Sequence, residues 1–133
     1  MLARILIADD DLAIRTLIRR ILEGQPEWKV CGEAVNGQDA VLKARELHPD
    51  LVVLDLAMPQ MNGLQAAKEI GRANPKLPML LLTVQEVSAE LVSEARKVGF
   101  QGAVSKSSVA DVVTGVETLL GEHSYFKPSD ARL

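Results

Sequence analysis

Short apolar runs of the kind that form β-strands alternate five times with segments whose apolar residues recur at helical spacing. This alternation predicts an α/β domain, in which right-handed crossovers join a parallel five-stranded sheet and helices cover both of its faces. Residues 51–54 are wholly apolar, as expected for a strand that is buried on both sides. The predicted strands are 4–8, 28–34, 51–54, 79–82 and 103–105, and the helices that follow them end near residues 24, 48, 74, 98 and 120.

Polar residues stand where three of these helices begin. An aspartate at position 10 or 11 can cap the first helix, because a carboxylate there accepts a backbone N–H of the first turn. Asn36 followed by Asp39 resembles a capping box at the start of the second helix. Ser108 followed by Asp111 has the same spacing at the start of the last helix.

The first helix is expected to bury one apolar side against the sheet. The residues expected to face the core are Ile14, Leu17, Ile18 and Ile21. Arg15, Arg19 and Arg20 fall between them, and we interpret these arginines as a solvent-exposed face.

The composition is that of a globular domain, with 133 residues, 47% of them apolar and 25% charged, and a formal net charge of −3. This charge indicates no surface for nucleic acid or for an anionic membrane. The start lacks the pattern of a signal peptide, and no apolar stretch is long enough to span a bilayer. The single cysteine, Cys31, fits a reducing compartment. We therefore expect a cytoplasmic domain over residues 1–121, followed by a C-terminal tail over residues 122–133.

Polar side chains follow four of the five predicted strands, at the point where each apolar run ends. They are Asp9, Asp10 and Asp11 after the first strand, Asp55 after the third, Thr83 after the fourth and Lys106 after the fifth. In open α/β sheets, ligands bind outside the carboxyl ends of the strands. We therefore expect these side chains to gather at one edge of the sheet and to form the functional site.

The residue types at this edge suit phosphoryl chemistry. Two carboxylates 4 Å apart repel by about 4 kcal/mol at an effective dielectric constant of 20, and a hard dication relieves that repulsion. Mg²⁺ prefers one or two carboxylates together with water and phosphate oxygens. A lysine and a hydroxyl can then hold a phosphoryl group, and an aspartate in such a setting can itself be the nucleophile and form an acyl phosphate. No glycine-rich G-x-x-x-x-G-K loop of a nucleotide-binding protein follows the first strand.

Four motifs carry a resemblance to a known family. They are I-L-I-A-D-D at residues 5–10, D-L-A-M-P-Q-M-N-G at 55–63, L-L-L-T at 80–83 and G-A-V-S-K at 102–106. With these motifs the chain resembles bacterial two-component response-regulator receiver domains over roughly residues 3–121. The stretch G-F-Q-G-A-V-S-K-S-S is most similar to the NarL-type subgroup. That subgroup usually carries a DNA-binding domain after the receiver, and we expect no such domain and no direct nucleic-acid binding within these residues.

The resemblance implies a flavodoxin-like fold, with strand order 2-1-3-4-5, and a Mg²⁺ site. That order places the first and third strands side by side, which the acidic residues need. By resemblance, Asp10 binds the metal directly, Asp9 binds it through water, and Asp55 and the backbone carbonyl of Ala57 complete the protein ligands.

The resemblance also implies a signalling role rather than an enzymatic one. Asp55 is the expected phosphoacceptor, Lys106 pairs with the phosphoryl group, and Thr83 moves towards it as a switch. The expected partners are a sensor histidine kinase or a phosphotransfer protein and a downstream protein that the sequence does not name. A homodimer is also compatible with the resemblance.

Two positions depart from the pattern of the family and concern the switch. Val84 follows the threonine where the family usually has alanine or glycine, so it is expected to crowd the phosphodonor or to restrict Thr83. Ala103 stands three residues before Lys106, where the family often has an aromatic residue that turns inwards. We expect the coupling here to depend on backbone and packing shifts instead.

Three alternative functions fit the sequence less well. A pseudo-receiver that binds partners without phosphorylation is disfavoured by the intact acidic set. Asp9 and Asp11 form the D-x-D of haloacid-dehalogenase-type phosphatases, but Ala13 stands where that motif has threonine or valine. A flavodoxin-type electron carrier would need a phosphate loop after the first strand and aromatic residues around a flavin.

Overall fold

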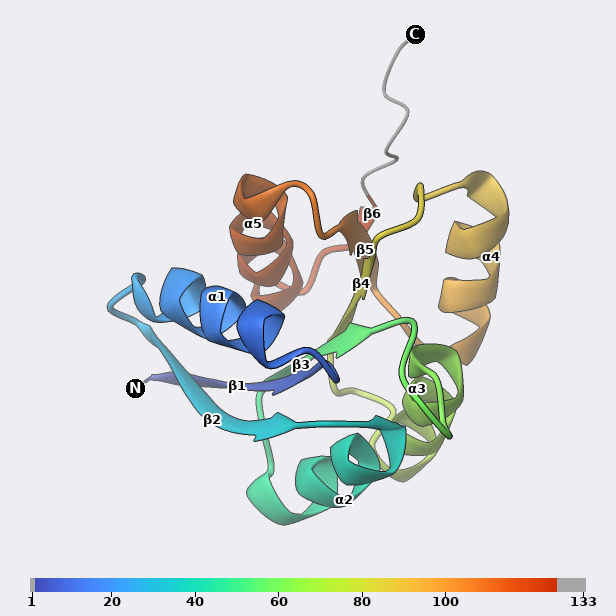
Figure 1. Ribbon diagram of the computed structural model, residues 1–133, viewed down its shortest axis with the longest axis horizontal. Coiled ribbons are helices and arrows are strands. Elements are labelled where there is room, and N and C mark those ends of the chain that lie inside the picture. The colour runs from blue at the N-terminus through green and yellow to red at the C-terminus, as the bar shows by residue number, and fades with distance from the viewer. Residues whose placement is uncertain (1, 127–133) are drawn as a thin grey trace, which may run out of the picture.

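The computed structural model describes residues 2–126, which form a single sheet with helices on both faces (Figure 1). The strands are β1 (Ala3–Ala8), β2 (Trp28–Ala34), β3 (Leu51–Asp55), β4 (Met79–Thr83), β5 (Gly102–Ser105) and β6 (Tyr125–Phe126). The helices are α1 (Leu12–Glu23), α2 (Gly37–Leu47), α3 (Gly63–Ala73), α4 (Ala89–Val98) and α5 (Val109–Leu120). The five predicted strands and five predicted helices are confirmed.

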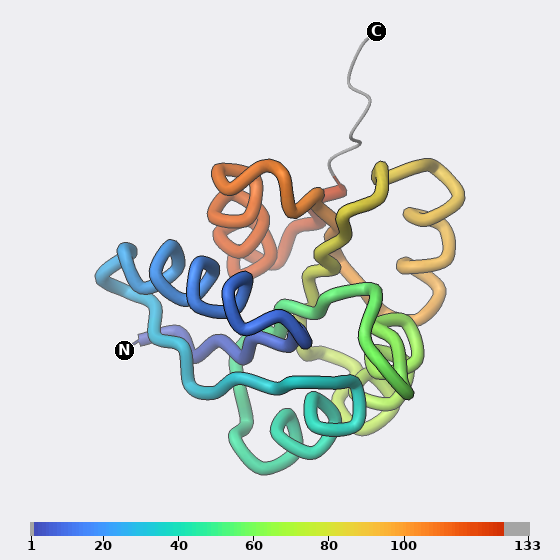
Figure 2. Tube along the Cα trace, viewed as in Figure 1, coloured from blue at the N-terminus to red at the C-terminus, as the bar shows by residue number. Residues whose placement is uncertain are grey.

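All strand pairs are parallel, and the sheet has the order β2-β1-β3-β4-β5-β6. The expected order 2-1-3-4-5 is therefore confirmed, with one further strand at the β5 edge. The Cα trace in Figure 2 shows α1 and α5 side by side on one face of the sheet, and α2 and α3 on the other. Within the described residues, no helix is both long enough and apolar enough to cross a bilayer.

Each face of the sheet has its own hydrophobic core, because alternate residues of a strand point to opposite faces. Ile5 and Ile7 of β1 pack with Ile18 and Leu22 of α1 and with residues of α5. Leu6 of the same strand packs on the other side, in the cluster that α2, α3 and α4 cover. The central strands are thus buried on both faces, as their uninterrupted apolar runs predict.

The sixth strand lies within the segment expected to be a tail. Tyr125 pairs with Gly102 and Phe126 with Ala103, and the N–H of Tyr125 donates to the carbonyl of Gln101 at 2.9 Å. A strand of two residues has no periodicity that a sequence pattern could reveal. The remainder of the expected tail, residues 127–133, lies outside the described residues, and the domain boundary at residue 121 stays a prediction.

The helix starts agree in part with the expected caps. Asp11 caps α1 by accepting the N–H of Ala13 at 2.9 Å, and Asn36 caps α2 by accepting the N–H of Asp39 at 2.7 Å. Ser108 is the N-cap residue of α5 but makes no capping hydrogen bond through its side chain. Asp111 instead accepts a hydrogen bond from the hydroxyl of Tyr125 at 3.0 Å, so the last cap does not form as expected.

The predicted inner face of α1 is wrong at two positions. Leu17, expected in the core, is 43% exposed, whereas Arg15, expected in solvent, is 9% exposed. Ile18 and Leu22 are buried, and they lie on the same helical face as Arg15 at spacings of three and seven residues. The helix therefore turns Arg15 towards the sheet, where its guanidinium donates to Glu33 and to the carbonyl of Asp9.

Candidate functional site

The carboxyl ends of β1 and β3 bring two acidic residues together. These strands are neighbours, with Ala8 paired to Leu54, so the residues that follow, Asp9 and Asp55, emerge side by side. Asp9 is fully buried and Asp55 is 3% exposed. A buried carboxylate needs a partner, because desolvation disfavours its charged form.

Asp10 joins these two carboxylates to form an acidic cluster. One carboxylate oxygen from each of Asp9, Asp10 and Asp55 lies within 4.8 Å of the other two, and Asp10 is the exposed member. The cluster thus has two buried oxygens and one at the surface. Three hard oxygen donors of this kind fit a Mg²⁺ ion that keeps several waters.

Lys106 places one positive charge between the two buried carboxylates of the cluster. Its Nζ lies 2.7 Å from Oδ2 of Asp9 and 2.9 Å from Oδ1 of Asp55. The lysine follows β5, and its backbone N–H donates to the carbonyl of Thr83 at 2.9 Å. The β4–β5 pairing therefore delivers the cation to carboxylates that come from β1 and β3.

Burial and the contacts among Lys106, Asp9 and Asp55 shift the pKa values of Asp55 and Lys106. Burial raises the pKa of Asp55, the negative charge of Asp9 raises it further, and contacts with Lys106 and with the backbone of Ala57 offset only part of the rise. Burial by itself lowers the pKa of Lys106, but the contacts with Asp9 and Asp55 outweigh that effect and raise it. The lysine is thus held in its charged form, while the ionised form of Asp55 is disfavoured by its surroundings.

Thr83 lies at the same edge of the sheet, where its hydroxyl bonds a backbone group of the following loop. It is 2% exposed, and its hydroxyl oxygen accepts the backbone N–H of Gln85 at 2.9 Å. Val84, which follows it, is 79% exposed, so this side chain extends into solvent. Both effects expected for Val84, crowding a phosphodonor and restricting Thr83, stay predictions.

The loop after Asp55 folds tightly against the strand, and Gly63 allows it to do so. The N–H of Gly63 donates to the carbonyl of Leu56 at 2.8 Å. A Cβ atom at Gly63 would stand 2.3 Å from the carbonyl oxygen of Asp55, so no larger residue fits there without moving the backbone. Asn62 and Gln65 then form a complete capping box that starts α3, which was not predicted from the sequence. The final glycine of the D-L-A-M-P-Q-M-N-G motif is thus required by close packing behind Asp55.

A pair of residues beneath the cluster was not predicted from the sequence. Nη1 of Arg15 donates to the carbonyl of Asp9 at 2.7 Å, and Nε donates to Oε1 of Glu33 at 2.9 Å. The arginine spacing alone gave no sign of this, because the partner of Arg15 stands on β2, far along the chain.

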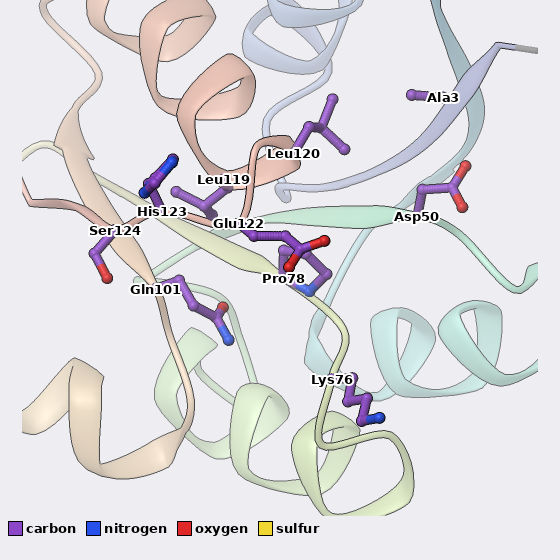
Figure 3. Close-up of a pocket in the computed structure, with 10 residues that line it drawn as sticks. All are labelled: Ala3, Asp50, Lys76, Pro78, Gln101, Leu119, Leu120, Glu122, His123 and Ser124. Atoms are coloured by element: carbon purple, nitrogen blue, oxygen red, sulfur yellow. The ribbon is translucent and has the colours of Figure 1, made fainter.

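A hollow at the other end of the sheet has no connection with this chemistry. It has a volume of about 880 Å³ and is lined by the amino ends of the strands and by the end of α5, with Asp50, Pro78 and Glu122 on its walls (Figure 3). The residues expected to carry function all lie at the carboxyl ends of the strands instead.

Comparison with known proteins agrees with this geometry. Residues 5–116 match the response regulator receiver domain family. The chain belongs to that family. Receiver domains are phosphoacceptor signalling modules of two-component systems, not enzymes, and this domain is one of them.

Individual receiver domains resemble this one closely. The chemotaxis protein CheY of Thermotoga maritima is 38% identical over 103 residues, which cover 77% of this chain and 84% of CheY. A LuxR-family response regulator from an Aurantimonas species has 30% identity and a TM-score of 0.91, over 98% of this chain and 92% of that one. The receiver domain of the putative response regulator NarL from Mycobacterium tuberculosis has 28% identity and a TM-score of 0.81, over 90% of this chain and 97% of that one.

The similar structures thus include LuxR-family and NarL receivers, in line with the resemblance drawn from the sequence, as well as the response regulator domain of CheB from Thermotoga maritima. The chain spans about a third of the length of the protein-glutamate methylesterases that it also matches.

Proposed function

We propose that Asp55 is the residue of this receiver domain that accepts the phosphoryl group. The observation that carries the proposal is the buried carboxylate of Asp55, whose Oδ1 lies 2.9 Å from Nζ of Lys106, beside the carboxylates of Asp9 and Asp10. This arrangement combines a nucleophilic oxygen, a fixed cation and oxygen donors for a metal at one edge of the sheet.

In the proposed reaction an oxygen of Asp55 attacks the phosphorus of a phosphohistidine. The new O–P bond forms as the P–N bond breaks, and the imidazole leaves with the electron pair and takes up a proton. Lys106 then pairs with the phosphoryl oxygens, because a charge-assisted contact to phosphate is stronger than a neutral one. The donor is a histidine kinase or a phosphotransfer protein in the cytoplasm.

The proposal includes a Mg²⁺ site on the acidic cluster. Asp10 would bind the ion directly, Asp9 through water, and Asp55 and the carbonyl of Ala57 would complete the protein ligands. When bound, Mg²⁺ neutralises charge on the carboxylates and on the transferred phosphoryl group. The three clustered oxygens and the exposed position of Asp10 support this assignment.

Thr83 is proposed to sense the phosphorylated state. A phosphoryl group on Asp55 adds negative charge and acceptor oxygens near the end of β4. The Thr83 hydroxyl, which now accepts the N–H of Gln85, would move to donate to those oxygens and so shift the loop that leads into α4. A downstream protein would read the resulting change.

Intact mass spectrometry tests the proposal. The protein is incubated with acetyl phosphate and Mg²⁺ as wild type, as Asp55→Asn and as Asp50→Asn, which alters an exposed aspartate at the opposite end of the sheet. Wild type and Asp50→Asn should gain one phosphoryl group, and Asp55→Asn should gain none. A folded wild type that gains no phosphoryl group at any Mg²⁺ concentration would be a pseudo-receiver.

A further inference from the structure

Arg15 is a buried cation that the proposed chemistry does not use. It lies on the inner face of α1, and its guanidinium donates to the carbonyl of Asp9 at 2.7 Å and to Glu33 at 2.9 Å. The planar fork of an arginine makes these two bonds from different nitrogens in a fixed geometry, whereas a lysine offers a single nitrogen. Arg15 therefore ties the end of β1, the start of α1 and the strand β2 to one another.

Glu33 is itself held in place. It stands opposite Ile7 in the β1–β2 pairing, and its second carboxylate oxygen lies 3.0 Å from Nη1 of Arg19. The anchor of Arg15 is thus a strand residue with two arginine partners. Because Glu33 holds one nitrogen of the Arg15 guanidinium, the carbonyl that the other nitrogen binds is held in place as well.

The group fixed by Arg15 is the peptide between Asp9 and Asp10. The carbonyl of Asp9 and the N–H of Asp10 belong to one planar unit, so holding the carbonyl sets the direction in which Asp10 leaves the strand. Asp9 has further support, because its carboxylate contacts the N–H of Asp11 at 2.9 Å and Lys106 at 2.7 Å. Within the described residues the exposed carboxylate of Asp10 has no such partner, so its place in the cluster depends on the backbone.

We propose that Arg15, anchored by Glu33, is a positioning residue that aims Asp10 at the metal, an inference that rests on the proposed function. Residues that orient metal ligands in this way commonly contribute as much as 10- to 100-fold to metal affinity. A bond between helix and sheet that only supported the fold would change the stability but leave the affinity for Mg²⁺ unaltered.

The test measures the dissociation constant of Mg²⁺ by amide chemical-shift titration, with the melting temperature recorded for each variant. Arg15→Met should weaken Mg²⁺ binding by about ten-fold. Arg15→Lys, which keeps the charge and is the more conservative change if the methionine variant does not fold, should weaken it less. Arg4→Gln is the matched control, because it removes another arginine that ties β1 to a neighbouring segment, through the carbonyls of Leu47 and His48, without touching Glu33 or Asp9. It should lower the melting temperature and leave the dissociation constant unchanged.

Phosphorylation by acetyl phosphate gives a second readout. The rate for Arg15→Met should fall at low Mg²⁺ and recover at saturating Mg²⁺, since a positioning defect in the ligand is overcome by mass action. If the folded Arg15 variants bind Mg²⁺ as tightly as wild type, the positioning role is wrong, while the proposed function stands. If wild type binds no more Mg²⁺ than Asp10→Ala, the proposed metal site itself is wrong.

Discussion

Ala103 of β5 and Phe126 of β6 stand opposite each other as paired residues of neighbouring parallel strands. Phe126 packs against the core cluster that contains Ala103 and residues of α4, and its ring centroid lies 4.3 Å from the guanidinium carbon of Arg96 in that helix. The position that lacks an aromatic residue in β5 therefore has an aromatic neighbour from β6. Any movement of α4 relative to β5 must change the surroundings of this ring.

We expect Phe126→Ala to loosen β6 and to release Tyr125, which is the only tyrosine of the chain. Because the ring of Phe126 is only half-buried, the substitution should lower the free energy of unfolding by about 1–2 kcal/mol, below the 3–5 kcal/mol typical of core positions. Burial and the Asp111 carboxylate raise the pKa of Tyr125. The bond from Tyr125 therefore stabilises the fold below about pH 10 and is lost as the pH rises through the raised value.

Ultraviolet absorbance titration of Tyr125 checks this expectation. In Phe126→Ala the pKa should return towards the ordinary value of about 10. Asp111→Asn is the control, because it removes the charge that raises the pKa while leaving Phe126 in place. Identical titration curves for Phe126→Ala and wild type would show that β6 stays docked without its aromatic ring.

Lys106→Ala should still allow Asp55 to be phosphorylated, but more slowly and with a weaker conformational response. Without Mg²⁺ the variant should be less stable by about 3 kcal/mol, because two buried carboxylates lose their cation. Since its partners raise the pKa of Lys106, the stabilisation in wild type is present at neutral pH, while the carboxylates are ionised, and is lost as the pH rises from about 10.4 through the raised value.

Amide chemical-shift changes on phosphorylation measure this response. They should shrink around α4 and α5 in Lys106→Ala and stay as in wild type for Lys97→Ala, an exposed lysine of α4. Shift changes in Lys106→Ala that equal those of wild type would contradict the role of this lysine.

Asp55→Asn should be more stable than wild type at neutral pH in the absence of metal. The pKa of Asp55 is raised in the folded protein, so the folded state holds this proton more firmly than the unfolded chain does. The contribution of this group to stability therefore falls as the pH rises from about 3.9 through the raised pKa. The neutral asparagine avoids this loss, and a gain of about 1 kcal/mol would raise the melting temperature by roughly 3–6 °C.

Calorimetry from acidic to neutral pH, with and without Mg²⁺, measures the difference. The advantage of Asp55→Asn should grow with pH and should shrink when Mg²⁺ is added, because the ion relieves the repulsion in wild type. A variant that is less stable than wild type throughout this range would mean that the Lys106 ion pair outweighs the cost of burying the carboxylate.

Val84→Ala should speed phosphorylation by a small donor and leave the stability almost unaltered. The side chain is 79% exposed, and surface substitutions of this kind usually change the free energy of unfolding by less than about 0.5 kcal/mol. With the branched side chain removed, a donor meets less crowding beside Thr83. Equal rates with acetyl phosphate for the two proteins would show that Val84 does not limit access.

The fold and the main cluster were predictable because each depends on features local in the sequence. Apolar runs identify β1 and β3, and parallel neighbours must place the residues after them, Asp9 and Asp55, at one edge. Helical spacing could not distinguish Arg15 from Leu17 as the inner residue, because the choice depends on Glu33 in another strand.

The sixth strand was missed for a similar reason. Tyr125 has no alternating pattern around it, and its place is set by tertiary neighbours. Gly115 leaves room for the ring of Tyr125, since a Cβ atom at Gly115 would stand 3.3 Å from that ring. Contacts between distant segments decide such details, and a single sequence does not record them.

The central claim is that the phosphoryl group resides on Asp55, and chemical trapping tests this most directly. Borohydride reduces the acyl phosphate of an aspartate to homoserine, which peptide mass spectrometry locates in the chain. After treatment with acetyl phosphate and Mg²⁺, homoserine should appear at position 55 alone, and none should appear when acetyl phosphate is omitted. Homoserine at position 9 or 10 in wild type, with Asp55 unmodified, would contradict it.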